Sequence, residues 1–235
     1  MKTLIIATRD GTRLKLKKPK CLVRISKHKL IELILNTCKN AGLEDFLLVT
    51  GYKAEMVEKS VKNIASKYKI RVKFIYNDEW EKENGISVYK AKEWINEKFL
   101  LLMSDHLFEP AMLNKLLTYS NTQECIIGVD KDLTKLYDLE EATKVKLYED
   151  KVIDIGKHLN NYNAVDTGLF LLNPLIFEVL EGLIAKKQYK LNDAFTLLAR
   201  RDKLQAADLS GYFWIDIDTK QDLQFAREVA RKFGW

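Results

Sequence analysis

Cysteine, histidine and proline are scarce in this sequence, whose 235 residues contain only three of each. The cysteines are widely separated, at Cys21, Cys38 and Cys125, and they form no C-x-x-C pair. An odd number of isolated cysteines argues against a disulfide framework and against a cysteine zinc site. We therefore expect reduced thiols and a cytoplasmic protein.

Long apolar runs are absent too. No stretch reaches the length of a membrane span, and the N-terminus lacks a signal-peptide pattern, so no membrane insertion is expected. The sequence also lacks internal repeats, low-complexity stretches and linkers. It therefore predicts a single globular unit over residues 1–235.

Acidic residues are fewer than basic ones: the chain has 33 Asp and Glu against 39 Lys and Arg, which gives a net charge of +6. This balance suggests an anionic partner. Nucleic acid and a phosphorylated small molecule both fit, although no recognisable nucleic-acid-binding motif is present. Charged residues make up 31% of the chain, above the usual quarter or so, which is compatible with a thermophilic source.

Apolar runs alternate with helical patterns as far as Met103. The runs predict strands at Lys2–Ala7, Asp45–Thr50, Arg71–Tyr76 and Phe99–Met103, and the second and the last of these are expected to be buried. Apolar residues at helical spacing predict helices between them, at His28–Asn40, Ala54–Lys67 and Val88–Ile95. Ser87 is the expected cap of the third helix. Such alternation is typical of parallel strands with right-handed crossovers.

The pattern changes after Asp105. Strands with short turns between them are expected at Cys125–Val129, Ala142–Tyr148, Lys151–Ile155 and Ala164–Leu172. Helices are expected at Ile176–Ala185 and Asn192–Arg200, followed by a strand near Phe213–Ile217 and a basic helix from Asp222. The predicted fold class is α/β: a mostly parallel central sheet with helices on both faces and an antiparallel extension.

Asp105 is the first candidate for chemistry. It follows the buried strand Phe99–Met103 directly, and ligands of open parallel sheets bind beyond the carboxyl ends of strands. An alternative is that Ser104 and Asp105 only cap a helix that Pro110 begins.

Two loops also follow predicted strands. The segment from Thr8 to Lys20 is rich in cations and backbone donors, which suits a polyphosphate, but a solvated basic surface has the same composition. The long segment from Asn77 to Ser87 suits recognition of a nucleobase, or is an ordinary surface loop.

Several ordered stretches together resemble the sugar-1-phosphate nucleotidyltransferase family. They are A-T-R-D-G-T-R with P-K, E-N-G-I-S, M-S-D-H, I-G-K, V-D-T-G-L-F and W-I-D-I-D-T-K, and they extend from Thr3 to about Arg227. Within that family, M-S-D-H, E-E-A-T-K-V, I-G-K-H-L and Y-N-A-V-D-T-G-L-F look most like CTP:inositol-1-phosphate cytidylyltransferases. The resemblance implies a Rossmann-like fold and the conversion of CTP and inositol 1-phosphate to CDP-inositol and pyrophosphate. CDP-inositol is a precursor of inositol-phosphate solutes.

The resemblance also assigns roles to residues. Arg13, Lys20, Asp105 and Asp216 would be catalytic, and Asp105 and Asp216 would hold Mg²⁺, with Asp218 as the alternative second ligand. The nucleotide would contact Ala7, Gly11, Thr12, Arg13, Lys20, Asn84, Gly85, Ser87 and Ser104. The acceptor would contact Glu141, Lys144, Lys157, Asp166, Thr167 and Gly168. The nucleotide-binding half would then be about residues 1–130, and the acceptor-binding half about 131–235.

Some of these assignments have plain structural alternatives. Lys144 and Lys157 are also typical strand-surface lysines, and Asp166 is also a typical turn residue. The chain departs from the family loop A-A-G-x-G-T-R by carrying Thr8 and Arg9, and the Arg9 side chain either crowds the nucleotide or adds a cation to it.

Other functions remain open at this point. They are a sugar- or phosphocholine-type nucleotidyltransferase, a non-catalytic nucleotide sensor, and nucleic-acid binding through Lys15 to Lys29. The expected partners are small-molecule substrates and a separate membrane transferase that uses CDP-inositol. No nucleic-acid partner is expected, and the chain is expected to form a homo-oligomer.

Overall fold

The computed structural model describes residues 1–134 and 139–233. In the first half of the chain the elements are β1 (Thr3–Ala7), β2 (Asp10–Gly11), β3 (Leu16–Pro19), the 3₁₀ turn η1 (Lys20–Leu22), α1 (Leu30–Asn40), β4 (Asp45–Thr50), α2 (Ala54–Tyr68), β5 (Arg71–Tyr76), α3 (Asn84–Tyr89), η2 (Lys92–Trp94), β6 (Phe99–Met103), β7 (His106–Phe108) and α4 (Pro110–Leu117). The later elements are β8 (Cys125–Asp130), β9 (Lys144–Tyr148), β10 (Lys151–Gly156), β11 (Ala164–Leu172), α5 (Leu175–Ile184), α6 (Leu191–Arg200), β12 (Leu204–Asp208), β13 (Trp214–Asp216) and α7 (Lys220–Phe233).

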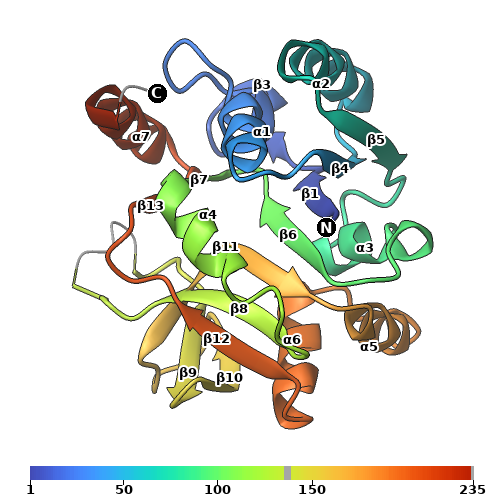
Figure 1. The fold of residues 1–235 in the computed structure, drawn as a ribbon, viewed down its shortest axis with the longest axis vertical. Helices are drawn as coiled ribbons and strands as arrows, with labels where there is room; N and C mark the ends of the chain where they lie inside the picture. Colours follow the sequence, from blue (N-terminus) through green and yellow to red (C-terminus); the bar gives the residue numbers. More distant parts are fainter. Residues whose placement is uncertain (135–138, 234–235) are drawn as a thin grey trace.

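A nine-stranded sheet runs through the molecule in the order β5-β4-β1-β6-β11-β8-β12-β10-β9. Its first four strands are parallel, as the alternating pattern predicts. All five residues of β1 are buried, because this strand lies between β4 and β6 and is covered on both faces. In Figure 1 this half of the chain, coloured blue to green, forms the upper part of the molecule.

The other half of the sheet is mixed, which confirms the predicted extension. β11 runs antiparallel to both β6 and β8, and β10 runs antiparallel to β9 and β12. β11 also pairs with β9, so the sheet curls at this end. Strand β12 was not predicted, because its residues L-Q-A-A-D contain no β-branched or aromatic side chain to indicate a strand.

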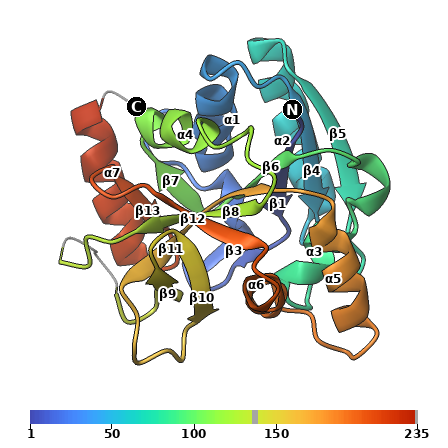
Figure 2. The same cartoon turned by 60° about the horizontal axis from the view of Figure 1, so that its bottom comes forward.

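Helices cover both faces of the sheet, as expected. One core lies between the sheet and α1, α2, α4 and α7, and the other between the sheet and α3, α5 and α6. Figure 2 shows α1, α4 and α7 on one side of the strands and α5 and α6 on the other. The last helix therefore packs back against the first part of the chain. No helix among residues 1–134 and 139–233 is long and apolar enough to cross a membrane.

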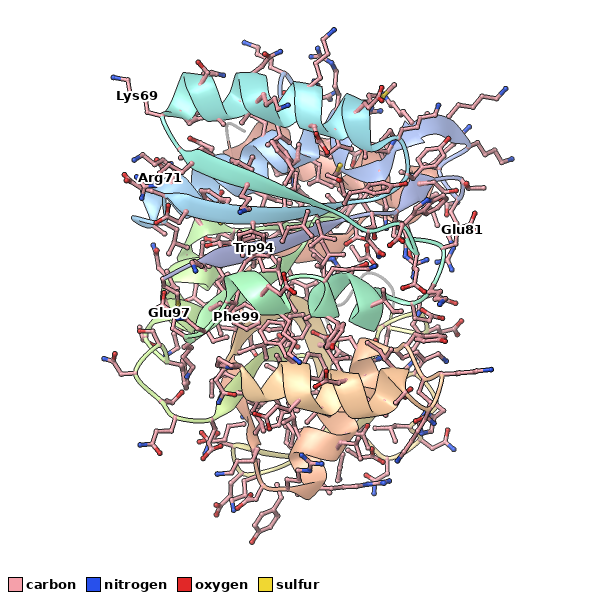
Figure 3. The ribbon with its side chains drawn as sticks, turned by 90° about the vertical axis from the view of Figure 1, so that its right-hand side faces the viewer. Lys69, Arg71, Glu81, Trp94, Glu97 and Phe99 are labelled. Carbon is pink, nitrogen blue, oxygen red and sulfur yellow. The ribbon has the colours of Figure 1, made fainter. Side chains whose placement is uncertain are left out.

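Strand β5 forms one edge of the sheet. Figure 3 looks onto this edge, with Arg71 at the beginning of β5 and Lys69 in the turn that follows α2. In the same view α2 and α5 lie at opposite ends, with the strands and α3 between them.

Three local predictions are wrong. The helix expected at Val88–Ile95 is instead α3, which begins at Asn84, followed by the short turn η2. Ser87 therefore lies inside α3 and does not cap a helix; its buried hydroxyl accepts a hydrogen bond from Asn77 Nδ2 at 3.0 Å. The structure also forms the small strands β2 and β3 in a segment expected to be a loop, and β7 after Asp105, where no strand was expected.

Candidate active site

A cleft of about 1110 Å³ opens where β1 and β6 end. Its position matches the rule that ligands bind at the carboxyl ends of parallel strands. Residues of both halves of the chain line it. The predicted site residues among them are Gly11, Arg13, Lys20, Asn84, Ser104, Asp105, Glu141, Lys157, Asp166, Gly168, Asp216 and Asp218.

Two short strands bring the acidic residues together. β7 pairs with β13, which places Asp216 opposite His106, and the Ile217 N–H donates to the Asp105 carbonyl at 3.1 Å. Helix α4 begins at Pro110 with Glu109 before it, so Asp105 does not cap that helix. The strand-end interpretation of Asp105 is therefore the one that the fold supports.

Lys20 lies at the centre of the cleft's acidic residues. Its Nζ donates to Asp105 Oδ2 at 2.9 Å, to Asp216 Oδ1 at 3.2 Å, and to Asp218 Oδ1. The predicted second cation, Arg13, pairs with the other oxygen of Asp218 at 3.0 Å. We call Asp105, Asp216 and Asp218 the acidic cluster. Asp218 belongs to it although β13 ends at Asp216, so strand alternation is not what aligns the two carboxylates.

These contacts determine the charge states at the site. Burial lowers the pKa of Lys20, but the three carboxylates outweigh burial and hold that pKa well above its usual range. Burial raises the pKa of Asp105, and Lys20 with His106 reverses that effect and keeps the carboxyl ionised. The pKa of Asp216 is raised, first by burial and then by the charge of Asp105.

His106, the last residue of the M-S-D-H stretch, is a part of the site to which the sequence assigned no role. Its Nδ1 is 2.9 Å from Asp105 Oδ1 and 3.9 Å from Asp216 Oδ1, and its ring stacks on Trp214 with 6.2 Å between centroids. Burial lowers the pKa of His106, but Asp216 and Asp105 outweigh burial and raise it to about 9. The sequence placed His106 beside a carboxylate, but only the β7–β13 pairing gives it a second one.

The cluster's donor atoms suit a hard cation. Ligand atoms of Asp105, His106 and Asp216 all lie within 4.8 Å of one another. Carboxylate oxygens are the donors that Mg²⁺, Ca²⁺ and Mn²⁺ prefer. Among the described residues, this arrangement fits the metal-binding role expected for Asp105 and Asp216.

The far side of the cleft belongs to the antiparallel region. Asp166 Oδ1 accepts the Gly168 N–H at 2.8 Å, and Lys157 Nζ pairs with Glu141 at 3.1 Å. Helix α6 also contributes one polar stripe that was not predicted, formed by Asn192, Asp193, Thr196 and Arg200. These residues are spaced along the helix on the side opposite the buried residues of α6. That spacing indicates an exposed helix face, but it does not indicate that the face lines a cleft.

Six predicted residues do not line the cleft: Ala7, Thr12, Gly85, Ser87, Lys144 and Thr167. Several of these residues make hydrogen bonds to other residues of the protein. The Thr167 hydroxyl donates to the Gly128 carbonyl at 2.9 Å, and Lys144 Nζ donates to the Glu140 carbonyl. The Gly85 N–H donates to the Tyr189 carbonyl at 2.9 Å, and a Cβ on Gly85 would lie 2.6 Å from that oxygen. These contacts are structural, and the assigned substrate roles of the six residues remain predictions.

Two residues link the loops on the nucleotide side. Asn84 Oδ1 accepts the Leu191 N–H at 3.1 Å, which ties α3 to the beginning of α6. Arg9, the departure from the family loop, points to Glu83 with 3.4 Å between Nη2 and Oε2, and both residues line the cleft. The Arg9 side chain therefore connects the first loop to the residue that precedes α3.

Comparison with known proteins identifies the family, because residues 2–232 match the description Nucleotidyl transferase. This chain belongs to the nucleotidyl transferase family. A relative from Aquifex aeolicus, "Bifunctional IPC transferase and DIPP synthase", is 35% identical over 233 residues, covering 97% of this chain and 51% of the relative. A protein of the same name from Archaeoglobus fulgidus is 32% identical over 231 residues, covering 97% and 44%. This nucleotidyl transferase thus spans about half the length of the curated relatives it matches first.

Solved structures support the same fold. The inositol-1-phosphate CTP transferase from T. maritima superposes with a TM-score of 0.86 at 22% identity, covering 97% of this chain and 96% of that one. At that identity the likeness shows the fold alone. The α/β nucleotidyl transferase architecture expected from the sequence is therefore confirmed.

Proposed function

We propose that this nucleotidyl transferase transfers a cytidylyl group from CTP to inositol 1-phosphate, giving CDP-inositol and pyrophosphate. The observation that carries the proposal is the meeting of Lys20, Arg13 and the acidic cluster in one cleft at the ends of β1 and β6. The names of its relatives support the choice of substrates.

The reaction needs charge neutralisation more than proton transfer. An oxygen of the acceptor phosphate attacks the α-phosphorus of CTP and forms a new P–O bond, and the bond from that phosphorus to the β-phosphate oxygen breaks. The electron pair leaves with pyrophosphate. A phosphate monoester has its second pKa near about 6, so the acceptor is already ionised at neutral pH and needs no general base.

The cations of the first loop would hold the triphosphate. Lys20 offers a compact ammonium and Arg13 a planar guanidinium that binds two oxygens at once. Both cations would stabilise the transition state more than the bound substrate, because negative charge then accumulates on the oxygens around the α-phosphorus and on the departing pyrophosphate. The loop backbone at Gly11, which also lines the cleft, would help to cradle the phosphates.

Asp105 and Asp216 would hold Mg²⁺, and Asp218 is the alternative second ligand. Bound there, the ion would offset the phosphates' negative charge and help to align the two reacting groups. The antiparallel region would choose the acceptor, with the Lys157 ammonium near its phosphate and Asp166 near its ring hydroxyls. In this division, residues 1–130 bind the nucleotide and residues 131–235 bind the acceptor, within one globular unit.

The wider setting follows from the product. An enzyme that consumes CDP-inositol must act next, and a separate membrane transferase is the candidate. We expect this chain to work in the cytoplasm as a homo-oligomer, with small-molecule substrates and no nucleic acid.

Pyrophosphate release tests the activity. CTP, UTP, ATP and dTTP are each combined with inositol 1-phosphate, glucose 1-phosphate, phosphocholine and a phosphorylated amide in the presence of Mg²⁺. We expect the pair CTP and inositol 1-phosphate to give the highest kcat/KM. Asp105→Asn is the matched inactive control, because it keeps the side-chain shape while removing the charge; we expect a loss of at least about 100-fold with an unchanged circular dichroism spectrum.

Two results would overturn the proposal. Preference for another acceptor would indicate a different transferase, a possibility supported by a CTP:phosphoglutamine cytidylyltransferase from Campylobacter jejuni that is 26% identical over 256 residues, covering 95% of this chain and 98% of that one. Saturable CTP binding without pyrophosphate release from any acceptor would indicate a nucleotide sensor.

A further inference from the structure

All three hydrogens of the Lys20 ammonium are engaged by carboxylates. An ammonium has three donors, and Nζ contacts one oxygen each of Asp105, Asp216 and Asp218. The Lys20 side chain is only 8% exposed, and the three carboxylate side chains are 17–40% exposed. The ammonium is therefore the best-shielded member of the group, and solvent screens its charge weakly.

A divalent cation at the acidic cluster needs the same oxygens. Asp105 Oδ2 and Asp216 Oδ1 are bonded to Lys20, while Asp105 Oδ1 is 2.9 Å from His106 Nδ1. A divalent cation bound to these atoms would lie within a few ångströms of the ammonium, about the distance of one ion pair, where like charges repel strongly at low dielectric. The two cations therefore compete for one set of ligands.

We propose that Lys20 and the divalent cation exchange places at the acidic cluster, and that this exchange couples metal binding to nucleotide binding. The inference rests on the divalent-cation part of the proposed function. Lys20 has a flexible four-carbon stem, so the displaced ammonium can turn to phosphates bound in the same cleft. Without phosphates the ammonium keeps its three carboxylate partners, and the protein alone holds the metal weakly. Coupling of this kind is reciprocal between the two ligands.

Direct metal binding to the full chain, without nucleotide, tests the exchange. Mn²⁺ is the probe, since it shares the oxygen preference of Mg²⁺ and its free fraction is read by electron paramagnetic resonance. We expect Lys20→Met to bind Mn²⁺ at least about tenfold more tightly than wild type, because the competing charge is gone. Lys20→Arg keeps the charge and should stay near wild type.

Lys18→Met is the matched control. Lys18 lies on β3, two residues before Lys20. Within the described part of the chain it forms no ion pair with the acidic cluster, so its removal lowers the net charge by one without releasing a ligand. At about 0.15 M salt the Debye length is near 8 Å, and we expect less than a twofold effect from this variant.

Removing Lys20 leaves three carboxylates close together, so Lys20→Gln, which retains a hydrogen-bond donor, serves as a second variant. We expect Mn²⁺ to raise the melting temperatures of Lys20→Met and Lys20→Gln by more than it raises that of wild type. Three outcomes would each overturn the exchange: an Mn²⁺ affinity of Lys20→Met and Lys20→Gln equal to that of wild type, an equal gain in affinity for Lys18→Met, or no Mn²⁺ binding by any variant. No CTP or acceptor is present, so a wrong choice of substrates would leave this result unchanged.

Discussion

Asp166 is a carboxylate that burial disfavours. Burial raises its pKa to about 6, and the Gly168 N–H and the charge of His106 offset that effect only in part. The ionised form at neutral pH is therefore less favourable in the folded protein than in the unfolded chain. Retaining such a group is typical of functional sites, where stability is given up for chemistry.

Replacing Asp166 with Asn should stabilise the protein at neutral pH. The folded pKa lies above the unfolded one, so folding binds a proton between these values and wild-type stability falls as pH rises from about 4 to about 6. We expect the melting temperature of Asp166→Asn to exceed that of wild type at pH 7.5 and the difference to shrink towards pH 4. The same variant should discriminate less between inositol 1-phosphate and glucose 1-phosphate, because the amide no longer accepts hydrogen bonds with both oxygens. A lower melting temperature at pH 7.5 would show that His106 stabilises the carboxylate more than burial costs.

Gly168 meets a different constraint, since its φ of +77° lies in the left-handed region and a Cβ there would be 2.4 Å from His106 Cδ2. We expect Gly168→Ala to lower the free energy of unfolding by about 1–3 kcal/mol and to reduce activity by moving the His106 ring. Gly182→Ala is the matched control, since Gly182 is exposed in α5 and nothing lies within 4 Å of the added carbon. Urea unfolding should place the control at or slightly above wild type. Equal effects of the two substitutions would contradict this account of Gly168.

At the scale of elements, the β9–β10 hairpin brings Lys157 to the cleft. β10 ends at Gly156, and Lys157 follows with its ammonium 3.1 Å from Glu141, which precedes β9. Both side chains are more than half exposed, so this ion pair contributes little to stability. A dianionic acceptor can therefore take the ammonium at little cost to the fold.

Lys157→Ala should raise the KM for inositol 1-phosphate by about tenfold while the Kd for CTP changes by less than about twofold, because the lost cation belongs to the antiparallel region that we propose binds the acceptor. Initial rates and a nucleotide titration measure the two constants. Lys146→Ala is the control on the same hairpin: Lys146 bonds to Asn161 and does not line the cleft. Weaker CTP binding with an unchanged acceptor KM would reverse the assigned roles of the two halves.

Over the whole molecule, the three cysteines report on global unfolding. Cys21, Cys38 and Cys125 are free and buried, on η1, α1 and β8. Burial raises the pKa of Cys21 to about 12 and that of Cys125 to about 11. Thiolates are the reactive species, so we expect Ellman's reagent at pH 8 to label none of them quickly in the native protein and all three in urea. Rapid labelling of one thiol under native conditions would identify a region that opens below the global free energy of unfolding.

Much of the fold was determined by local pattern. The long apolar runs gave β1, β4, β5, β6 and β11 correctly, and helical spacing gave α1, α2, α5 and α6 to within a few residues. Of the strands β2, β3, β7, β12 and β13, only β13 was foreseen. β12 has 5 residues, as β1 does, and was missed because it lacks β-branched and aromatic side chains. The other four strands are short, with 2 to 4 residues each. Short strands have too few residues for a period to appear, and they form because a neighbouring strand offers hydrogen bonds.

The candidate site divides in the same way. The sequence by itself determined which side chains follow strand ends, so Asp105 and the cations of the first loop were identifiable before any fold was known. Only the tertiary structure decided that Lys20 bonds to all three carboxylates, that His106 lies between Asp105 and Trp214, and that Thr167 and Ser87 bond within the fold. The physical reason is sequence separation: Lys20 and Asp216 are 196 residues apart, and no local pattern records a contact that exists only after the sheet has formed and β13 has paired with β7.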